Sequence, residues 1–309
     1  MRRERDRVDG VLLLDKPSGA SSNAVLQRAK RLFNAAKAGH TGTLDPLASG
    51  LLPLCFGEAT KFAQALLDSR KEYVATVRFG IGTTTGDAEG EIIGEASVSF
   101  DTDQLSATLA SFMGASQQVP PAYSALKFRG RSHYEYARAG IEVPRAPRSI
   151  FIDCLDLLEH AQDCAVLRVG CSKGTYVRTL AEDIAKALGT FGHLTALCRT
   201  ASGPFRLDHA HRLDDIESMD SAERRDLLLP VDAALMDLPS IELSPDDSLA
   251  LVQGRAVSLA SATAGGVRAY DAAGAFLGVA EIAAGVLRAV RLVATSPAIS
   301  REPTVDFSR

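Results

Sequence analysis

The order of strand-like and helix-like segments is the feature that most constrains how this chain can fold. Residues 10–16 form a short apolar run that stops before a Pro-Ser-Gly turn, which predicts a buried strand. Residues 71–83 alternate as a strand should, with one face made of Tyr73, Ala75, Val77 and Phe79. Residues 21–36 and 102–114 carry apolar residues at helical spacing, and residues 166–189 read as strand, tight turn and helix. The chain therefore mixes strands with helices.

The C-terminal part has a different pattern. Two prolines and scattered acidic residues predict a linker near residue 238, and short alternating segments split by glycine turns follow it. With 309 residues, the chain is long enough for one large domain and a smaller one. We expect a first domain over 1–238 and a small all-β module over 239–309 that ends in a disordered tail.

Basic residues are concentrated in two stretches, although the net charge is −4. Residues 18–44 hold four bases and no acid, and residues 127–148 hold six bases and two acids, while residues 201–250 hold 12 acids and 4 bases. Each basic stretch alone is compatible with a solvated face. Together with the acidic block they indicate a surface that faces a polyanion. The segment at about 120–150, rich in Pro, Gly, Tyr and Arg, predicts a projecting insertion with one short helix near residues 132–140.

Several classes of protein are disfavoured by the sequence. No run approaches the roughly 20 apolar residues of a membrane span, and the N-terminus lacks the features of a signal peptide, so we expect a cytoplasmic protein. The five cysteines include no C-x-x-C pair, which argues against a disulfide framework or a zinc ribbon. His209 and His211 form an H-x-H without a nearby third ligand, so no metal is expected. The glycine-rich segment at residues 79–90 lacks the G-K-[ST] ending of a phosphate-binding P-loop.

The stretch GHTGTLDPLASG, residues 39–50, places one acid, Asp45, in a loop of small residues. An Asp-Pro pair commonly opens a turn, and on this peptide alone that explanation stays open. The same composition suits the rigid presentation of a carboxylate. Pro46 disfavours the helical region for the residue before it, and the glycines let the backbone approach a ligand closely.

Six segments in order resemble the bacterial TruB family of tRNA pseudouridine synthases. They are VLLLDKPSGASS, GHTGTLDPLASGLLPLCFGEATK, KEYVATVRFGIGTTTGDAEG, VPPAYSALKFRG, SKGTYVRTLAEDIAKALG and VRAYDAAGAFLGVAEI. The resemblance implies an α+β catalytic domain around a curved, mixed but mostly antiparallel sheet flanked by helices, with a thumb-like RNA-binding insertion and a C-terminal PUA-like module. It also implies isomerisation of uridine 55 in the T-loop of tRNA, with no metal and no organic cofactor.

The resemblance assigns the chemistry to three residues. Asp45 is the expected nucleophile, and its attack at C1′, its attack at C6 and a glycal route all stay open. Arg178 is expected to pair with this carboxylate, and the alternative is a surface arginine in the first turn of a helix, where a cation is disfavoured. Tyr73 is expected to lie against the target base and to assist removal of the C5 proton, unless it is a core tyrosine of a strand.

Further residues are expected around the substrate. His40 is expected to enter the space that the flipped uridine leaves, although a structural hydrogen-bonding role is also open. Lys16 is expected to brace the catalytic loop or to meet phosphate, and Asp87 either lies near the substrate or forms a D-x-x-G turn. Tyr176 and Leu197 are expected to line the pocket.

The RNA contacts expected on the insertion come from Lys127, Arg129, Arg131 and Arg145. The family commonly has more arginine in the segment LCRTASGPF, and Cys198 and Ala201 depart from that pattern, which puts a phosphate contact in doubt. The expected partner is tRNA, bound at its T-arm and, through the C-terminal module, at its acceptor stem. We expect a monomer without an obligatory protein partner. An RNA-binding or RNA-folding protein, and a relative that depends on a guide RNA and partner proteins, are the competing functions.

Overall fold

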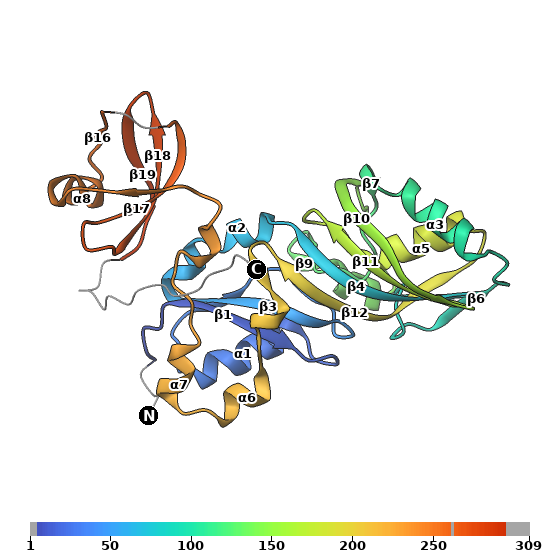
Figure 1. Cartoon of the computed structure of the whole chain (residues 1–309). Coiled ribbons are helices and arrows are strands. Elements are labelled where there is room, and N and C mark those ends of the chain that lie inside the picture. Colours follow the sequence, from blue (N-terminus) through green and yellow to red (C-terminus); the bar gives the residue numbers. More distant parts are fainter. Residues whose placement is uncertain (1–4, 261–262, 295–309) are drawn as a thin grey trace.

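The computed structural model describes residues 5–260 and 263–294, so the predicted disordered tail lies outside the described residues. The chain forms a long body around one sheet and a small C-terminal module to one side of it (Figure 1). Within the described ranges, no helix is both long and apolar enough to cross a membrane.

The body is built on a 10-stranded mixed sheet. Its main path runs β14-β1-β3-β12-β4-β11-β10-β7, with β2 and β13 paired at its side. The pairs β1–β14 and β3–β12 are parallel and the other pairs are antiparallel. The strands are β1 (Gly10–Lys16), β2 (Ala38–His40), β3 (Ser49–Phe56), β4 (Lys71–Phe79), β7 (Gly114–Gln118), β10 (Arg148–Ala161), β11 (Cys164–Cys171), β12 (Gly192–Ser202), β13 (Phe205–Arg206) and β14 (His211–Arg212).

Strand β4 lies near the middle of the sheet, where the alternation predicted it. Ala75, Val77 and Phe79 are at most 1% exposed and face the main core, while the residues between them are more open. β4 pairs with β12 on one side and β11 on the other, and the first of these pairings places Tyr73 opposite Arg199.

Three helices of 10 or 11 residues cover the sheet, each where the spacing predicted a helix: α1 (Ser22–Leu32), α3 (Thr102–Ser111) and α5 (Val177–Ala187). Ser21 caps α1 by accepting a hydrogen bond from the Ala24 N–H, and Asp101 forms a capping box at the start of α3. Helix α5 packs on β12 and β4 through a buried face that includes Leu180 and Ile184. Its first turn therefore lies beside the middle of the sheet.

Shorter elements complete the body. They are η1 (Gly57–Lys61), α2 (Ala63–Asp68), the hairpin β5 (Ile81–Thr83) and β6 (Ile92–Glu95), η2 (Leu207–His209), α6 (Leu213–Ser218), α7 (Ser221–Asp226) and η3 (Ala233–Leu235).

The predicted insertion connects two neighbouring strands. β7 and β10 pair antiparallel up to Gln118 and Arg148, and the residues between these positions leave the sheet. They form a small hairpin, β8 (Lys127–Phe128) with β9 (Arg131–Ser132), followed by helix α4 (His133–Arg138). The helix lies where the sequence predicted one.

The C-terminal module has its own core and a five-stranded sheet in the order β15-β17-β18-β19-β16. Its strands are β15 (Ser240–Glu242), β16 (Val257–Ser258), β17 (Gly265–Tyr270), β18 (Phe276–Ala283) and β19 (Val286–Leu292). The expectation of an all-β module is wrong in one respect, because helix α8 (Pro245–Val252) packs on β19 and β16. Ser244 caps this helix and Pro245 occupies its first turn, which are readable helix-start signals in the sequence.

Candidate active site

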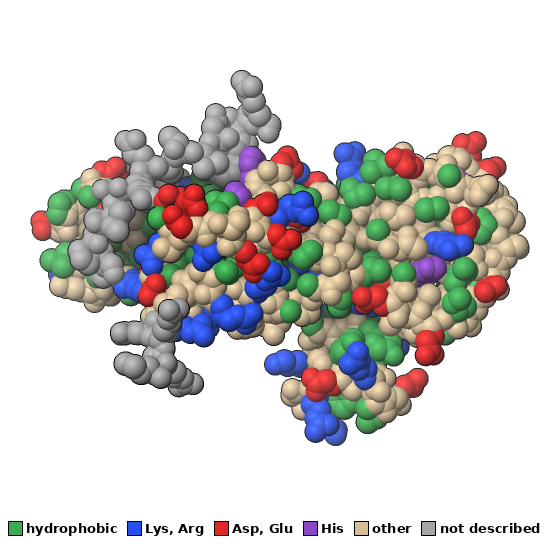
Figure 2. Space-filling view, turned by 90° about the horizontal axis from the view of Figure 1, so that it is seen from below, with side chains coloured by type: hydrophobic (Ala, Val, Ile, Leu, Met, Phe, Trp, Pro, Cys, Tyr) green, Lys and Arg blue, Asp and Glu red, His purple; other side chains and the backbone are tan. Residues whose placement is uncertain are grey.

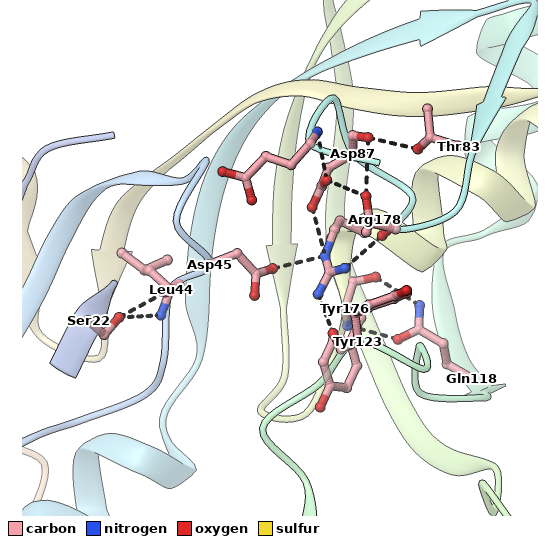
Figure 3. A network of polar contacts seen from close by, with 11 residues as sticks. Ser22, Leu44, Asp45, Thr83, Asp87, Gln118, Tyr123, Tyr176 and Arg178 are labelled. Carbon is pink, nitrogen blue, oxygen red and sulfur yellow. Dashed lines mark hydrogen bonds and ion pairs between the residues drawn. The ribbon is translucent and has the colours of Figure 1, made fainter. Parts of the chain in front are cut away.

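The loop that carries Asp45 connects β2 to β3 and is fastened from two sides. Ser22, at the start of α1, donates through its hydroxyl to the Leu44 carbonyl (2.9 Å) and accepts from the Leu44 N–H (2.8 Å) (Figure 3). The Lys16 ammonium donates to the Pro46 carbonyl at 3.4 Å. The residues on both sides of Asp45 are therefore anchored, which fixes the direction of its side chain.

Gly50 closes the loop against strand β12. Its φ is +96°, and a Cβ there would lie 2.4 Å from the Arg199 carbonyl oxygen. Only glycine fits this close approach of two backbones without distortion. The parallel pairing of β3 with β12 begins at this point, so Gly50 determines where the loop joins the sheet.

The Asp45 carboxylate points at Arg178, the second residue of α5. Its Oδ2 lies 2.9 Å from the Arg178 Nε, and the Asp45 side chain is 37% exposed whereas that of Arg178 is 5% exposed (Figure 3). The guanidinium also donates to the Thr85 carbonyl (2.7 Å) and the Tyr123 carbonyl (2.8 Å). Arg178 is thus held by three segments, and it presents one face to a carboxylate that remains accessible.

Asp87 lies behind this ion pair. It is 3% exposed, and its Oδ2 is 3.6 Å from the Arg178 Nε. Its Oδ1 accepts from the Thr85 hydroxyl (2.5 Å) and from the Glu89 N–H (3.1 Å). The D-x-x-G turn is also present, because the Gly90 N–H donates to the Asp87 carbonyl at 3.2 Å. The predicted turn is therefore present and places the Asp87 carboxylate against Arg178, while a position near the substrate stays a prediction.

Burial dominates the electrostatics of Asp45. Removal from bulk water raises the pKa of the Asp45 carboxyl above its usual value, the Arg178 charge acts against this increase, and the Asp87 charge adds to it. The arginine therefore offsets part of the desolvation and also orients the carboxylate.

Lys16 lies beneath the loop and is fully buried. Its ammonium donates to the carbonyls of Pro17 (2.9 Å) and Ala20 (2.6 Å) as well as to Pro46, so each N–H has a carbonyl partner. Desolvation lowers the pKa of Lys16 to about 8, and the Asp45 charge partly opposes this shift. Of the two expected roles, the geometry favours bracing of the loop over contact with a phosphate.

His40 is the last residue of β2, before the loop, and Tyr73 lies on β4 opposite Arg199; both side chains are half-buried. Burial raises the pKa of the Tyr73 phenol, and the Arg199 guanidinium, which hydrogen-bonds to it, works in the opposite direction. Burial and the Arg199 charge lower the pKa of His40, so its ring is neutral near pH 7. The His40 Nδ1 is buried and has no hydrogen-bond partner among the described residues.

Two further predicted residues lie beside the ion pair or in the core below it. Tyr176 immediately precedes α5, and its ring is half-buried. Leu197 is 8% exposed on β12 and belongs to the main core. Charge interactions link Asp45 to Arg178, Asp87, Lys16, Tyr73 and Tyr176, while His40 lies on β2 and Leu197 on β12. Their roles toward a substrate stay predictions.

The four predicted RNA contacts are exposed on the segment between β7 and β10. Lys127, Arg129 and Arg131 belong to the β8–β9 hairpin, and Arg145 follows α4 and donates to the Pro120 carbonyl at 3.0 Å. In Figure 2 this segment projects at the lower edge of the molecule and carries several basic side chains. Within the described ranges, no group of three or more His, Cys, Asp or Glu side chains is placed to hold a metal ion.

Comparisons with known proteins agree with this arrangement. Residues 30–177 match the N-terminal domain of the TruB family of pseudouridylate synthases, residues 178–236 match the C-terminal domain of tRNA pseudouridylate synthase B, and residues 239–293 match the C-terminal part of pseudouridine synthase II TruB. The tRNA pseudouridine synthase B of Thiobacillus denitrificans is 54% identical over 295 residues, which cover 96% of this chain and 99% of that protein. The chain belongs to the TruB family of pseudouridine synthases.

Other relatives and solved structures are similar as well. The tRNA pseudouridine synthase B of Aromatoleum aromaticum is 55% identical over 95% of this chain and 96% of its own length. A chain of a Cbf5-Nop10-Gar1 complex superposes with a TM-score of 0.67 and 28% identity, over 88% of this chain and 78% of that one. A chain of an H/ACA RNP bound to a substrate RNA containing 2'-deoxyuridine has a TM-score of 0.66 and 26% identity, over 88% and 77%. The predicted family and fold class are confirmed.

Two residues of this TruB family site were not predicted from the sequence. Arg199 is 1% exposed and donates to the Leu51 carbonyl (2.7 Å) and the Gly42 carbonyl (3.3 Å), so it supports the Asp45 loop from strand β12. Gln118 is 4% exposed, and its side-chain amide accepts from the Tyr176 N–H (2.8 Å) and donates to the Tyr176 carbonyl (3.1 Å). A lone arginine in a strand and a glutamine before two prolines give no signal of burial.

The two departures from the family pattern lie on either side of Arg199. Ala201 is 5% exposed, and Cys198 is half-buried with its sulfur next to Gly50. Cys198 pairs with Ser49 at the β3–β12 junction and Ala201 pairs with Glu72 of β4, while the arginine between them keeps its contacts with the loop.

Proposed function

We propose that this chain isomerises uridine 55 in the T-loop of tRNA to pseudouridine, with Asp45 acting on a nucleotide that has left its stack. The single observation that carries the proposal is the Asp45 carboxylate, which is 37% exposed and held 2.9 Å from a buried guanidinium. A carboxylate that is oriented, paired and still accessible is suited to nucleophilic catalysis.

The reaction is an isomerisation within one nucleotide. The bond from C1′ to N1 breaks, a bond from C1′ to C5 forms, and the proton on C5 is replaced by one on N1, so nothing is added or removed overall. The freed base has to stay in the site while it turns. Tyr73, whose raised pKa keeps the phenol protonated at neutral pH, presents a ring on which uracil stacks. Asp45 reacts with the nucleotide, and Arg178 stabilises its charge.

Extrusion of the uridine leaves an apolar space in the RNA stack. His40 is suited to fill it because burial lowers the pKa of its ring, which is therefore uncharged at neutral pH. Lys16 braces the catalytic loop rather than the RNA. Tyr176, Leu197 and Asp87 complete the walls of the site and the support for Arg178.

The substrate assignment rests on charge and on relatives. Proteins named tRNA pseudouridine synthase B share more than half of their residues with this chain. Within the proposed division of the chain, residues 1–238 supply the chemistry, and the thumb-like insertion grips the T-arm through Lys127, Arg129, Arg131 and Arg145. The second part of the division, 239–309, holds the PUA-like module in its described residues, and this module contacts the acceptor stem. We assign the enzyme to the cytoplasm as a monomer that needs no protein partner.

The test is to incubate the purified protein with an unmodified T-arm stem-loop and to map pseudouridine at single-nucleotide resolution. Product at position 55 alone is expected, and no product without added proteins would favour a guide-dependent enzyme. Asp45→Asn should reduce turnover by on the order of 10⁴-fold or more while RNA binding changes little. Asp103→Asn, on the exposed surface of α3, is the matched control and should keep full activity. Wild-type turnover in Asp45→Asn would refute the nucleophile, and tight binding without product in the wild type would favour an RNA-binding function.

A further inference from the structure

The hairpin of β5 and β6 carries two groups that hold Arg178. The Thr85 carbonyl and the Asp87 carboxylate lie in its connecting loop, 2.7 Å from the Arg178 Nη1 and 3.6 Å from the Arg178 Nε (Figure 3). Strand β6 is largely open to solvent, since Ile92 and Ile93 are 61% and 64% exposed. The position of Arg178 therefore depends on how this hairpin is attached to the rest of the body.

A phenylalanine ring covers the hairpin at a point where its two strands face each other. Gly82 and Gly94 lie directly opposite one another across β5 and β6. A Cβ at either position would lie 2.8 Å from the ring of Phe191, which immediately precedes β12. Neither glycine has a positive φ, so the space taken by the ring, rather than the backbone conformation, favours glycine here.

The segment that begins with Phe191 also holds the hairpin through its backbone. The Gly80 N–H, just before β5, donates to the Phe191 carbonyl at 2.8 Å. Farther along, the Leu194 N–H donates to the Gly86 carbonyl (3.0 Å), and the Leu194 carbonyl accepts from the Ala88 N–H (2.9 Å). This short segment thus fastens the hairpin at its base, at its glycine pair and beside the arginine.

The contact of the ring with the glycine pair is its distinctive feature. Phe191 is 42% exposed, so it gains less from burial than a core phenylalanine does. Glycine in a strand has no side chain to pack, and an aromatic ring over it supplies that packing. Since one ring covers both strands, it sets the distance between the whole hairpin and the start of β12.

We propose that Phe191 is a positioning residue for Arg178 and acts on it through the β5–β6 hairpin. The inference rests on the proposed function for the reaction concerned. A shift of the hairpin moves the Thr85 carbonyl and Asp87 together, and both hold the guanidinium that faces Asp45. A displacement of about 1 Å in a catalytic group can reduce turnover by about 10²-fold.

The first measurement compares three variants on the unmodified T-arm stem-loop. Phe191→Ala removes the ring, Phe191→Tyr keeps it, and Ile93→Ala, the matched control, removes an exposed apolar side chain from the same hairpin. Phe191→Ala should lower kcat by about 10-fold or more and leave KM within about twofold, because the ring acts on the arginine and not on RNA binding. Phe191→Tyr and Ile93→Ala should keep kcat within about twofold of wild type.

A double-mutant cycle with Arg178→Lys tests whether the ring acts through the arginine. Arg178→Lys keeps the positive charge and removes the guanidinium, so the placement of that group no longer matters. Under single-turnover conditions, Phe191→Ala should cost about 10-fold in the wild type and less than about threefold in the Arg178→Lys background. A general structural defect would cost the same factor in both backgrounds.

Amide hydrogen exchange of the RNA-free protein gives a readout that does not require activity. The Ala88 and Leu194 amides, which join the loop to β12, should exchange about 10-fold or more faster in Phe191→Ala than in wild type. In Ile93→Ala they should exchange at the wild-type rate. Thermal unfolding shows whether each variant is folded. If Phe191→Ala does not fold, Gly94→Ala displaces the ring from the other side and is measured in the same way.

Three results would overturn the proposal: equal kcat for Phe191→Ala and Ile93→Ala, equal losses in the two backgrounds of the cycle, or unchanged exchange of the Ala88 amide in Phe191→Ala. A wild-type protein that makes no pseudouridine on the stem-loop would instead refute the proposed function. The exchange measurement would then still decide whether Phe191 holds the hairpin.

Discussion

At the scale of single residues, the site consists of ionisable groups held largely out of water. Burial raises the pKa of Asp45 and lowers that of Lys16 and His40, so each environment favours the uncharged form. The guanidinium groups of Arg178 and Arg199 are held by backbone carbonyls. Burying the charged forms of these groups therefore costs folding free energy, and the hydrogen bonds around the loop offset part of that cost.

Asp45→Asn is expected to leave stability unchanged or slightly raised at pH 7, although it abolishes activity. The folded-state pKa of Asp45 lies above its usual value, so the ionised form costs stability at pH values above both pKa values. The gain should stay below about 1 kcal/mol, because solvent screens a carboxylate that is 37% exposed. Urea denaturation at pH 7 and at pH 4.5 measures the difference in free energy of unfolding between the variant and the wild type, and this difference should be smaller at pH 4.5. A strongly destabilised variant would contradict this account.

Lys16 makes the free energy of unfolding depend on pH in the opposite direction to Asp45. Its folded-state pKa is about 8 and its ordinary value is 10.5, so the unfolded chain binds more protons between these values and stability rises with pH. The free energy of unfolding of the wild type relative to Lys16→Met should increase by about 1.5 kcal/mol from pH 8 to 9.5. The difference between wild type and Lys16→Met at each pH cancels the contribution of the buried cysteines to the pH dependence, because both proteins contain them. Lys186→Met, at an exposed position, should show no such trend.

At the scale of elements, the start of helix α5 decides how Arg178 is presented. No side chain caps this helix in the usual way. Instead the side-chain amide of Gln118, at the end of β7, hydrogen-bonds to both the N–H and the carbonyl of Tyr176. Because Gln118 is also the last residue before the insertion, one side chain joins the thumb-like segment to the helix that carries the arginine.

Gln118→Leu should therefore damage both stability and turnover. It leaves the Tyr176 N–H without its partner, which costs about 1–3 kcal/mol, while the Tyr176 carbonyl keeps the Leu180 N–H as a donor. A small displacement of Arg178 should reduce kcat by about 10-fold or more. Gln117→Leu is the control, since Gln117 is exposed and its side-chain amide donates to the Ser149 hydroxyl at 2.7 Å. Equal effects of the two substitutions on kcat would contradict the positioning role.

The elements of this fold were largely predictable, because alternation and helical spacing are local signals. Strand β4, helices α1, α3 and α5 and the insertion helix lie where the pattern placed them. Helix α8 was missed because it is short and weakly amphipathic, although Ser244 and Pro245 signal its start. The burial of Lys16, Arg199 and Gln118 could not be predicted, since each depends on carbonyl or amide partners that only the folded sheet brings near.

At the scale of the whole molecule, the C-terminal module is fastened to the body at two places. Phe62 packs edge-on against Phe276, with ring centroids 5.5 Å apart, and nearby the Lys61 ammonium donates to the Leu292 carbonyl at 2.9 Å. On the linker, Asp232 accepts from the Tyr270 hydroxyl and pairs with Arg268 at 3.3 Å. The module thus has a defined position relative to the catalytic loop (Figure 1).

The position of the module affects binding only of an RNA substrate that is long enough to contact both the module and the Asp45 site. We propose that the module holds the acceptor stem while Asp45 acts on the T-loop. The rigid attachment of the module to the body then sets the effective concentration of the T-loop at the Asp45 site once the acceptor stem is bound. Asp232→Ala removes the shared partner of Arg268 and Tyr270, whose side chains lie at the linker. We expect KM for full-length tRNA to rise roughly 3- to 10-fold.

The isolated T-arm stem-loop supplies the internal control for this variant. Because it lacks the acceptor stem, kcat and KM on it should stay within about twofold of wild type. Steady-state kinetics on both RNAs with the same preparation make the comparison independent of the active fraction of protein. Equal changes in kcat or KM on the two substrates would mean that Asp232 stabilises the body of the protein. Unchanged kinetics on both would mean that the position of the module does not affect binding of full-length tRNA.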